Sequence, residues 1–187
     1  MIDGTLLKDM LNKSVFQPIV QENNVWVAKL KETAALAGLR EVDICGVSKD
    51  SILLKMDIGA PPADLLKHEL GQRCRCDYVL LTEYKGLRLI VYIDLKTAAG
   101  GHLHKGELVQ QFKGACCMTK YLEAILELFH AKKDYFGAFP ERRYVVFYKP
   151  RLQKNPTRPL PFKNNKPESF LRYPNPIRPK IGELVGV

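Results

Sequence analysis

The sequence has no run of 18 or more apolar residues, so it predicts no helix long enough to cross a bilayer. Its first residues, MIDGTLLKDMLNK, have no apolar core behind a basic start, which a secretory signal would need. It also has no internal repeat and no low-complexity tract. From these absences we expect a single cytoplasmic domain without a membrane partner, and 187 residues fit that size.

Cysteine is too scarce and too irregularly spaced to predict a disulfide framework. The five cysteines are an odd number, and no secretory signal accompanies them. A zinc site is the alternative, assembled from Cys74, Cys76, Cys116, Cys117, His102 and His104. The paired Cys-x-x-Cys spacing of many structural zinc sites is absent, so these residues are expected in the core or in loops.

Acidic residues are few at the C-terminal end, where the positive charge gathers. The net charge is +9, and residues 149–187 carry nine Lys or Arg against two Glu, whereas the first 148 residues are nearly balanced. A local basic excess favours a nucleic acid, because binding releases counterions from the phosphates; a solvated basic tail is the alternative. The residues expected to bind nucleic acid are Lys113, Lys149, Arg151, Lys154 and Arg158.

Apolar periodicity and turn residues divide the chain into expected elements. In order, these are helices at 5–15 and 25–38, strands at 41–48 and 51–58 paired across a Lys49-Asp50 turn, a short helix at 61–70, strands at 76–84 and 86–97 joined at Lys85-Gly86, a helix at 107–130 and a strand at 143–149. The order predicts an α/β (α+β) domain over residues 1–149, with a mixed sheet flanked by helices, a core at about 62–149 and a helical N-terminal portion at 1–40.

Proline is concentrated in one place. Eight of the twelve prolines fall between Pro150 and Pro179, and such a segment forms neither long helices nor central strands. We therefore expect residues 150–187 to be an extended basic arm. Its aromatic residues Phe162, Phe170 and Tyr173 are interpreted either as stacking platforms for bases or as anchors that hold the arm to the domain.

The central hairpin brings charged residues to an apolar strand. Asp94 and Lys96 are two residues apart, so they share one face of their strand, while Ile93 and Leu95 face the other way. A turn at Lys85-Gly86 predicts pairs whose residue numbers sum to about 171, which places Asp77 opposite Asp94. Two carboxylates and a backbone carbonyl suit Mg²⁺, which activates a bound water and stabilises charge on a phosphate. The adjacent ammonium can orient that water or neutralise developing charge.

These residues resemble the signature of the PD-(D/E)XK nuclease superfamily, which has the restriction-endonuclease-like fold. Asp77 is followed, after sixteen residues, by Asp94-Leu95-Lys96 at the end of an apolar strand. The resemblance implies that Asp77, Asp94 and the Leu95 carbonyl hold Mg²⁺ or Mn²⁺, and that Lys96 positions the attacking water. Cys76 stands where the name-giving proline would be, as a departure from the pattern.

The resemblance also points to accessory residues. It implies an upstream acid on a helix, for which Glu69 is the candidate, and a polar residue on the helix after the motif, for which Gln111 or Lys113 is the candidate. His102 and His104 follow the Lys96 strand in a glycine-rich loop and are interpreted as phosphate contacts or as ordinary loop residues.

The expected function is metal-dependent hydrolysis of phosphodiester bonds, with DNA as the substrate and either endonuclease or exonuclease action. The expected partners are nucleic acid and either a second copy in a homodimer or a partner subunit that supplies specificity. One alternative is a non-catalytic nucleic-acid-binding or assembly module on the same fold. Another is a protein-interaction module whose acids are ordinary solvated charges.

Overall fold

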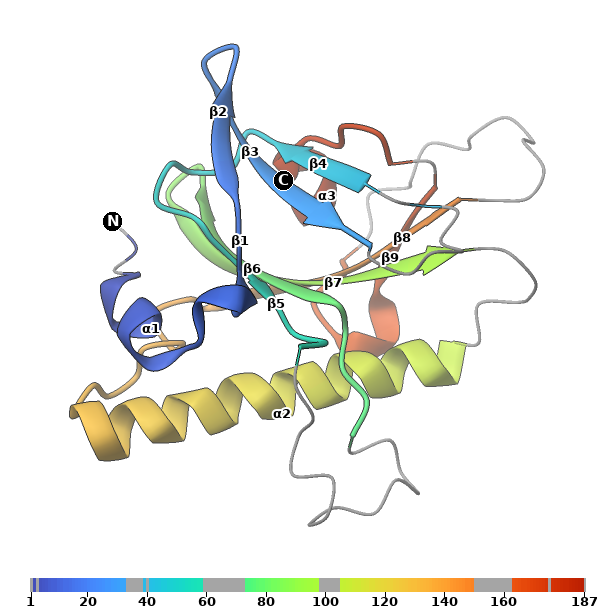
Figure 1. Cartoon of the computed structure of the whole chain (residues 1–187). Helices are drawn as coiled ribbons and strands as arrows, with labels where there is room; N and C mark the ends of the chain where they lie inside the picture. Colours follow the sequence, from blue (N-terminus) through green and yellow to red (C-terminus); the bar gives the residue numbers. More distant parts are fainter. Residues whose placement is uncertain are drawn as a thin grey trace.

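Two β-sheets and one long helix form the described part of the chain (Figure 1). The computed structural model describes residues 2, 4–32, 39, 41–58, 73–97, 105–149, 163–174 and 176–186. In chain order its elements are α1 (Thr5–Met10), η1 (Lys13–Val15), β1 (Phe16–Gln17), β2 (Ile19–Glu22), β3 (Val25–Lys31), β4 (Glu41–Cys45), β5 (Ile52–Lys55), β6 (Tyr78–Tyr84), β7 (Leu87–Thr97), α2 (Lys105–His130), β8 (Glu141–Lys149), η2 (Pro167–Ser169), β9 (Leu171–Pro174) and α3 (Ile181–Val185).

The larger sheet is mixed, with strand order β1-β5-β6-β7-β8-β9. Its strands are antiparallel from β1 to β7, and β7, β8 and β9 are parallel. Helix α2 makes the crossover from β7 to β8 and covers one face of this sheet, while the three-stranded sheet β2-β3-β4 lies on the other face (Figure 1). Each face has its own apolar cluster, so the sheet is buried on both sides. The expected mixed α/β class is confirmed.

The central hairpin forms as predicted. Strands β6 and β7 pair from Tyr78 with Ile93 to Tyr84 with Leu87, so the residue numbers of each pair sum to 171. Lys85 and Gly86 occupy the turn with φ of 50° and 78°, and a two-residue type I′ turn requires positive φ at both of these positions. Because a two-residue turn fixes the register, the sequence could place opposite residues correctly.

The expected N-terminal helical portion is wrong over residues 25–31, which form strand β3. The strand pairs with β2 across a turn at Asn23 and Asn24, whose φ values of 47° and 62° are tolerated well by asparagine. Ala28 and Leu30 are buried in the cluster between the sheets, and this tertiary burial decides for a strand. Of the expected helix at 5–15, α1 forms the first part.

The strands predicted at 41–48 and 51–58 exist, but they do not pair with each other. Strand β4 pairs with β3 in the small sheet, and β5 pairs with β6 in the large one. The reason lies in their burial: β4 alternates between buried and half-buried residues, whereas three of the four residues of β5 are buried. A strand covered on both faces belongs inside the larger sheet, so the turn between them connects two layers.

The C-terminal segment is not simply an extended arm, because residues 163–174 and 176–186 pack onto the domain. Strand β9 adds to β8 at the edge of the sheet, where proline is tolerated, and Pro174 is its last residue. The buried Asn164 side chain donates hydrogen bonds to the carbonyl oxygens of Tyr144 and Leu184, at 3.3 and 2.8 Å. Apolar residues of α3 complete the cluster between the sheets. The short helix expected at 61–70 and the start of the arm, residues 150–162, lie outside the described residues.

Candidate active site

Three charged side chains meet at one end of the β6–β7 hairpin. Asp77 directly precedes β6, and continuing the register by one residue places it opposite Asp94 of β7. Asp94 is completely buried, and Asp77 and Lys96 are half-buried. The Lys96 ammonium lies 2.9 Å from Asp94 Oδ2, and Asp77 Oδ2 accepts a hydrogen bond from the Leu95 N–H at 2.6 Å. The structure therefore brings together the three residues that the sequence predicted to be neighbours.

Backbone contacts fix the position of Asp77. Its carbonyl oxygen accepts a hydrogen bond from the Met56 N–H at 2.7 Å, so the residue is held between β5 and β7. The Cys76 thiol is buried in the core and donates to the Tyr78 carbonyl at 3.2 Å. The segment entering β6 is thus held by β5 on one side and by β7 on the other.

Helix α2 approaches this segment closely at Gly114. A Cβ atom built on Gly114 would lie 1.7 Å from the Cys74 carbonyl oxygen, which is far inside van der Waals contact. Only glycine permits the helix to lie this near the chain that leads into Asp77. The close packing couples the position of the first acid to the position of the helix.

Burial and mutual repulsion disfavour two charged acids at this site. Burial, followed by the nearby charge of Asp94, raises the pKa of Asp77 to about 8, against the opposing effect of the Leu95 N–H. Burial also raises the pKa of Asp94, although Lys96 opposes the shift. For Lys96, burial lowers the pKa, but attraction to Asp94 outweighs it and the pKa is raised. A protonated lysine therefore compensates one of two carboxylates, which leaves an acid without a counter-charge.

The Asp94 carboxylate can also accept further hydrogen bonds. Neither of its carboxylate oxygens has an aligned hydrogen-bond partner among the described residues, although both are buried. The Lys96 contact at 2.9 Å is an ion pair rather than an aligned hydrogen bond. Buried polar atoms are nearly always satisfied, so free lone pairs on a buried carboxylate indicate a missing cation or proton. Asp77, Asp94 and a backbone carbonyl fit Mg²⁺, which needs only one or two carboxylates besides water and phosphate oxygens.

Three side chains near the site were not predicted. Glu107, in the first turn of α2, raises the pKa of both Asp94 and Lys96 through its charge. Tyr148 of β8 lies beside Lys96 in the parallel register, and Arg172 of β9 lies beyond Val146 in the row that starts at Asp94. Tyr148 and Arg172 lie on the face of the sheet that α2 covers. Tyr148 alternates with Tyr144 and Val146 along β8, and Arg172 is two residues from Phe170, and all three of these apolar residues belong to the cluster on that face.

The sequence held a partial signal for these residues. Alternation along 143–149 assigns Tyr148 to one of two faces, but only the crossover through α2 shows that this face is the one with Asp94. Strands in a sheet lie about 4.8 Å apart, so Arg172 lies on the order of 10 Å from Asp94 across two strands.

The remaining predicted residues are scattered. Lys113 is exposed on α2 and pairs with Glu168 at 3.0 Å, and Lys149 is exposed at the end of β8. Gln111 is half-buried on α2, with a side-chain oxygen that has no hydrogen-bond partner among the described residues. The other predicted residues, Glu69, His102, His104, Arg151, Lys154 and Arg158, lie outside the described residues.

The described residues do not favour the zinc alternative. They contain no group of three or more His, Cys, Asp or Glu side chains arranged to hold a metal ion. Cys116 is half-buried and lies 3.2 Å from the Tyr144 hydroxyl, whereas Cys117 is exposed, so the adjacent pair is divided between two sides of the helix.

No described helix combines the length and the apolar character needed to span a bilayer.

Comparison with known proteins leaves the site to be interpreted from its own geometry, because neither protein-family models, nor curated proteins, nor solved structures gave a match.

Proposed function

We propose that the chain is a metal-dependent nuclease that hydrolyses phosphodiester bonds, with DNA as its substrate. The observation that carries the proposal is a completely buried carboxylate, Asp94, which lies opposite a second acid and has one ammonium, that of Lys96, as its cationic partner among the described residues. A protein interior can hold two acids and one ammonium only if one acid keeps its proton, as the raised pKa of Asp77 indicates for the metal-free chain, or if a cation compensates its charge. Mg²⁺ or Mn²⁺, held by Asp77, Asp94 and the Leu95 carbonyl, would lower the pKa of a bound water and polarise a phosphate oxygen.

The role of Lys96 follows from its protonation state. Since its pKa is raised by Asp94, Lys96 is an ammonium at neutral pH and cannot act as a general base. It can donate hydrogen bonds to the attacking water or to a phosphate oxygen and so stabilise the charge that develops in the transition state. Its half-exposed position beside a buried partner leaves its outer donors free to face substrate.

The surroundings of the site support a polymeric phosphate substrate. Arg172 is exposed in the same row as Asp94, at a distance suited to a neighbouring phosphate, and Tyr148 lies beside Lys96. Such contacts position the backbone of a nucleic acid without reading its bases. We therefore expect low intrinsic sequence specificity, or specificity supplied by a partner subunit.

The test is cleavage of defined DNA and RNA, single- and double-stranded, by the purified chain with Mg²⁺ or Mn²⁺. We expect Asp94→Ala and Lys96→Ala each to lose roughly 100-fold or more in rate, because each removes a group that acts on the transition state. Glu41→Ala is the matched control, since Glu41 is an exposed acid on β4 whose ion-pair partner is Lys31. Binding of nucleic acid without cleavage under either metal would support the non-catalytic alternative, and absence of both would refute the proposal.

A further inference from the structure

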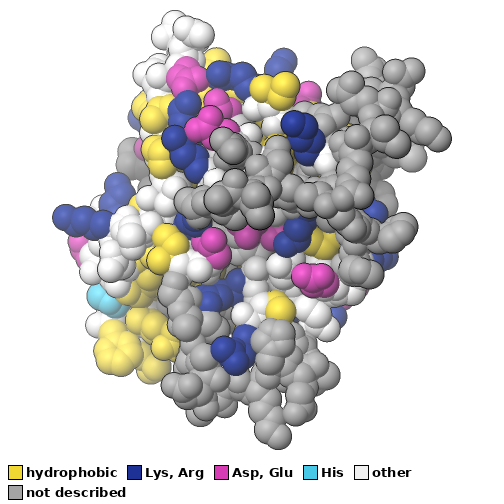
Figure 2. Space-filling view, turned by 45° about the vertical axis from the view of Figure 1, so that its right-hand side comes forward, with side chains coloured by type: hydrophobic (Ala, Val, Ile, Leu, Met, Phe, Trp, Pro, Cys, Tyr) yellow, Lys and Arg dark blue, Asp and Glu magenta, His cyan; other side chains and the backbone are white. Residues whose placement is uncertain are grey.

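Helix α2 has a second apolar face, turned away from the sheet. We call it the α2 outer stripe and define it by Cys117, Tyr121, Ala124 and Leu128, with Phe129 flanking its C-terminal end. Tyr121 is 60% exposed, and Leu128 and Phe129 are each 78% exposed. Figure 2 shows apolar side chains gathered at the lower left of that view, beside a histidine. Of the seven large apolar side chains that are exposed among the described residues, three lie in this one part of α2. Such a concentration indicates an interaction surface.

The spacing of the stripe is that of a helix–helix seam. Cys117, Tyr121, Ala124 and Leu128 follow at intervals of four, three and four, the repeat with which one helix packs along another. The opposite face of α2 already fills the core, through residues that include Phe112, Leu122 and Leu126. The domain needs only one apolar face on this helix to fold, so the second face is available for another helix.

Charges beside the stripe favour a copy of the same helix in the opposite direction. Lys120 and Glu127 are both exposed and lie along one edge of the stripe, seven residues apart. When two α2 helices run antiparallel and cross at Ala124, Lys120 of each copy lies beside Glu127 of the other. A parallel arrangement would instead set this edge against the other edge of the partner's stripe, so Lys120 and Glu127 would not meet. The edge is therefore self-complementary under a twofold axis, as an isologous interface requires.

We propose that the α2 outer stripe binds a second copy of this chain, with the two α2 helices antiparallel and crossing at Ala124. The small side chain at the crossing permits close approach, and Tyr121 of each copy packs next to Leu128 of the other. The large side chains of the stripe supply on the order of 500 Å² per copy, which is near the lower limit for a specific interface. We therefore expect a dissociation constant in the micromolar range.

The arrangement has a consequence for the proposed active sites, and this step rests on the proposed function. Glu107 marks the site end of α2, and the crossing lies seventeen residues further along. At 1.5 Å per residue, the two sites would be roughly 50 Å apart along the paired helices. Such a dimer would cut a long nucleic acid at two separate places rather than at two facing phosphates.

The first test measures the mass of the native chain by light scattering and sedimentation between about 1 and 100 µM, the range set by the expected affinity. We expect a concentration-dependent shift from 21.3 kDa to twice that mass. Leu128→Glu should weaken association at least tenfold, because it places a charge in the apolar seam. Ile177→Glu is the matched control: Ile177 is 80% exposed but lies in the C-terminal segment, so the same change there should leave the dimer intact.

The second test fixes the orientation. Lys120→Glu and Glu127→Lys should each weaken the dimer, and the double variant should restore it, because each swapped pair regains an opposite charge across the antiparallel interface. Circular dichroism confirms that each variant is folded, and all three positions are exposed. A native chain that stays monomeric up to 100 µM, a dimer unaffected by Leu128→Glu, or a failure of the double swap would each overturn the proposal. Binding of the monomer to lipid vesicles through the stripe would overturn it as well. None of these measurements depends on nuclease activity.

Discussion

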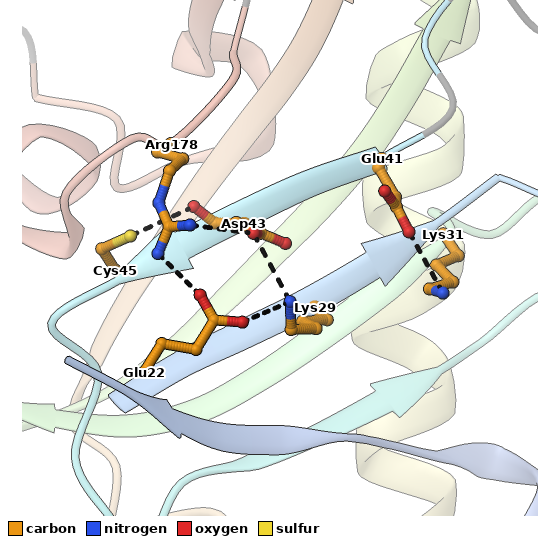
Figure 3. A network of polar contacts seen from close by, with 7 residues as sticks. All are labelled: Glu22, Lys29, Lys31, Glu41, Asp43, Cys45 and Arg178. Atoms are coloured by element: carbon orange, nitrogen blue, oxygen red, sulfur yellow. Dashed lines mark hydrogen bonds and ion pairs between the residues drawn. The ribbon is translucent and has the colours of Figure 1, made fainter. Parts of the chain in front are cut away.

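Two groups of charged side chains in this molecule contain two acids each but differ in how those acids are balanced by bases. The first is the site, with Asp77, Asp94 and Lys96. The second, which we call the surface network, contains Glu22, Lys29 and Asp43 of the small sheet and Arg178 of the C-terminal segment beside it (Figure 3). The site has two acids for one base, whereas the surface network has two acids for two bases.

Geometry and burial separate the two groups further. In the surface network, Lys29 lies 2.6 Å from Glu22 and 3.6 Å from Asp43, and Arg178 lies 2.9 and 3.7 Å from the same two acids. Hydrogen bonds from Lys29 and Arg178 lower the pKa of Glu22. At the site, burial raises the pKa of both acids. A balanced set of charges is complete in the folded chain, but an unbalanced buried set must take up a proton or a cation, and this difference is the physical basis of the proposed function.

The largest expected effect separates activity from stability. Asp94→Asn should reduce cleavage roughly 100-fold or more, because it removes a proposed metal ligand and the partner of Lys96. It should not lower the denaturation midpoint of the metal-free chain, since Asp77 and Lys96 then remain as one acid and one base. Cleavage rates and urea denaturation measure the two effects. Asp43→Asn is the control in the surface network, and there the rate should be unchanged. A large loss of stability in Asp94→Asn would show that the acid is structural.

The next effect concerns pH in the metal-free chain. The pKa of Asp77 is raised from an unfolded value of 3.8 to about 8, so between these values the folded state binds a proton that the unfolded state has lost. Stability contributed by this group is therefore present below pH 4 and is lost as the pH rises towards 8. Asp77→Asn should flatten the fall in denaturation midpoint between pH 5 and 8, and added Mg²⁺ should stabilise the native chain more at pH 8 than at pH 6. An Asp77→Asn variant with the native pH profile would contradict this assignment.

The sequence was sufficient to predict which residues meet at the centre of the site, because these residues belong to a single hairpin. Asp77 and Asp94 belong to two strands joined by a two-residue turn, and the turn alone fixes which residues lie opposite. Glu107, Tyr148 and Arg172 could not be found in the same way, because their positions depend on how α2 crosses over and which strands follow.

The errors at the two ends of the chain have the same physical origin. The segment at 25–38 has apolar residues that fit a helix or a strand, and burial of Ala28 and Leu30 between the sheets decides for β3 over residues 25–31. At the C-terminal end, the prolines excluded a central strand correctly, but the apolar residues between them were sufficient for an edge strand and for α3. In both places tertiary burial decides between structures that the local sequence permits.

A smaller effect tests whether the position of the site depends on α2. Gly114→Ala places a Cβ against the Cys74 carbonyl, so the helix or the segment entering β6 must shift. We expect a loss of about 1–3 kcal/mol in unfolding free energy and a reduced cleavage rate. Gly106→Ala is the matched control on the same helix, because a Cβ there meets no atom of the described residues within 4 Å. It should leave the rate unchanged and stabilise the helix slightly. Equal behaviour of the two variants would show that the close approach at Gly114 does not position the site.

The smallest effect is expected in the surface network itself. Arg178→Ala removes contacts to Glu22 and Asp43, but the guanidinium is half-exposed and water compensates for most of the loss. We expect the melting temperature to fall by no more than about 2 °C and the difference to shrink further in 1 M salt, which screens exposed charges. The cleavage rate should be unaffected, because Arg178 contacts the small sheet, whereas the site lies on the other face of the large sheet. A tenfold loss of cleavage in Arg178→Ala would mean that the surface network acts on substrate, and the contrast between a complete and an incomplete set of charges would then fail.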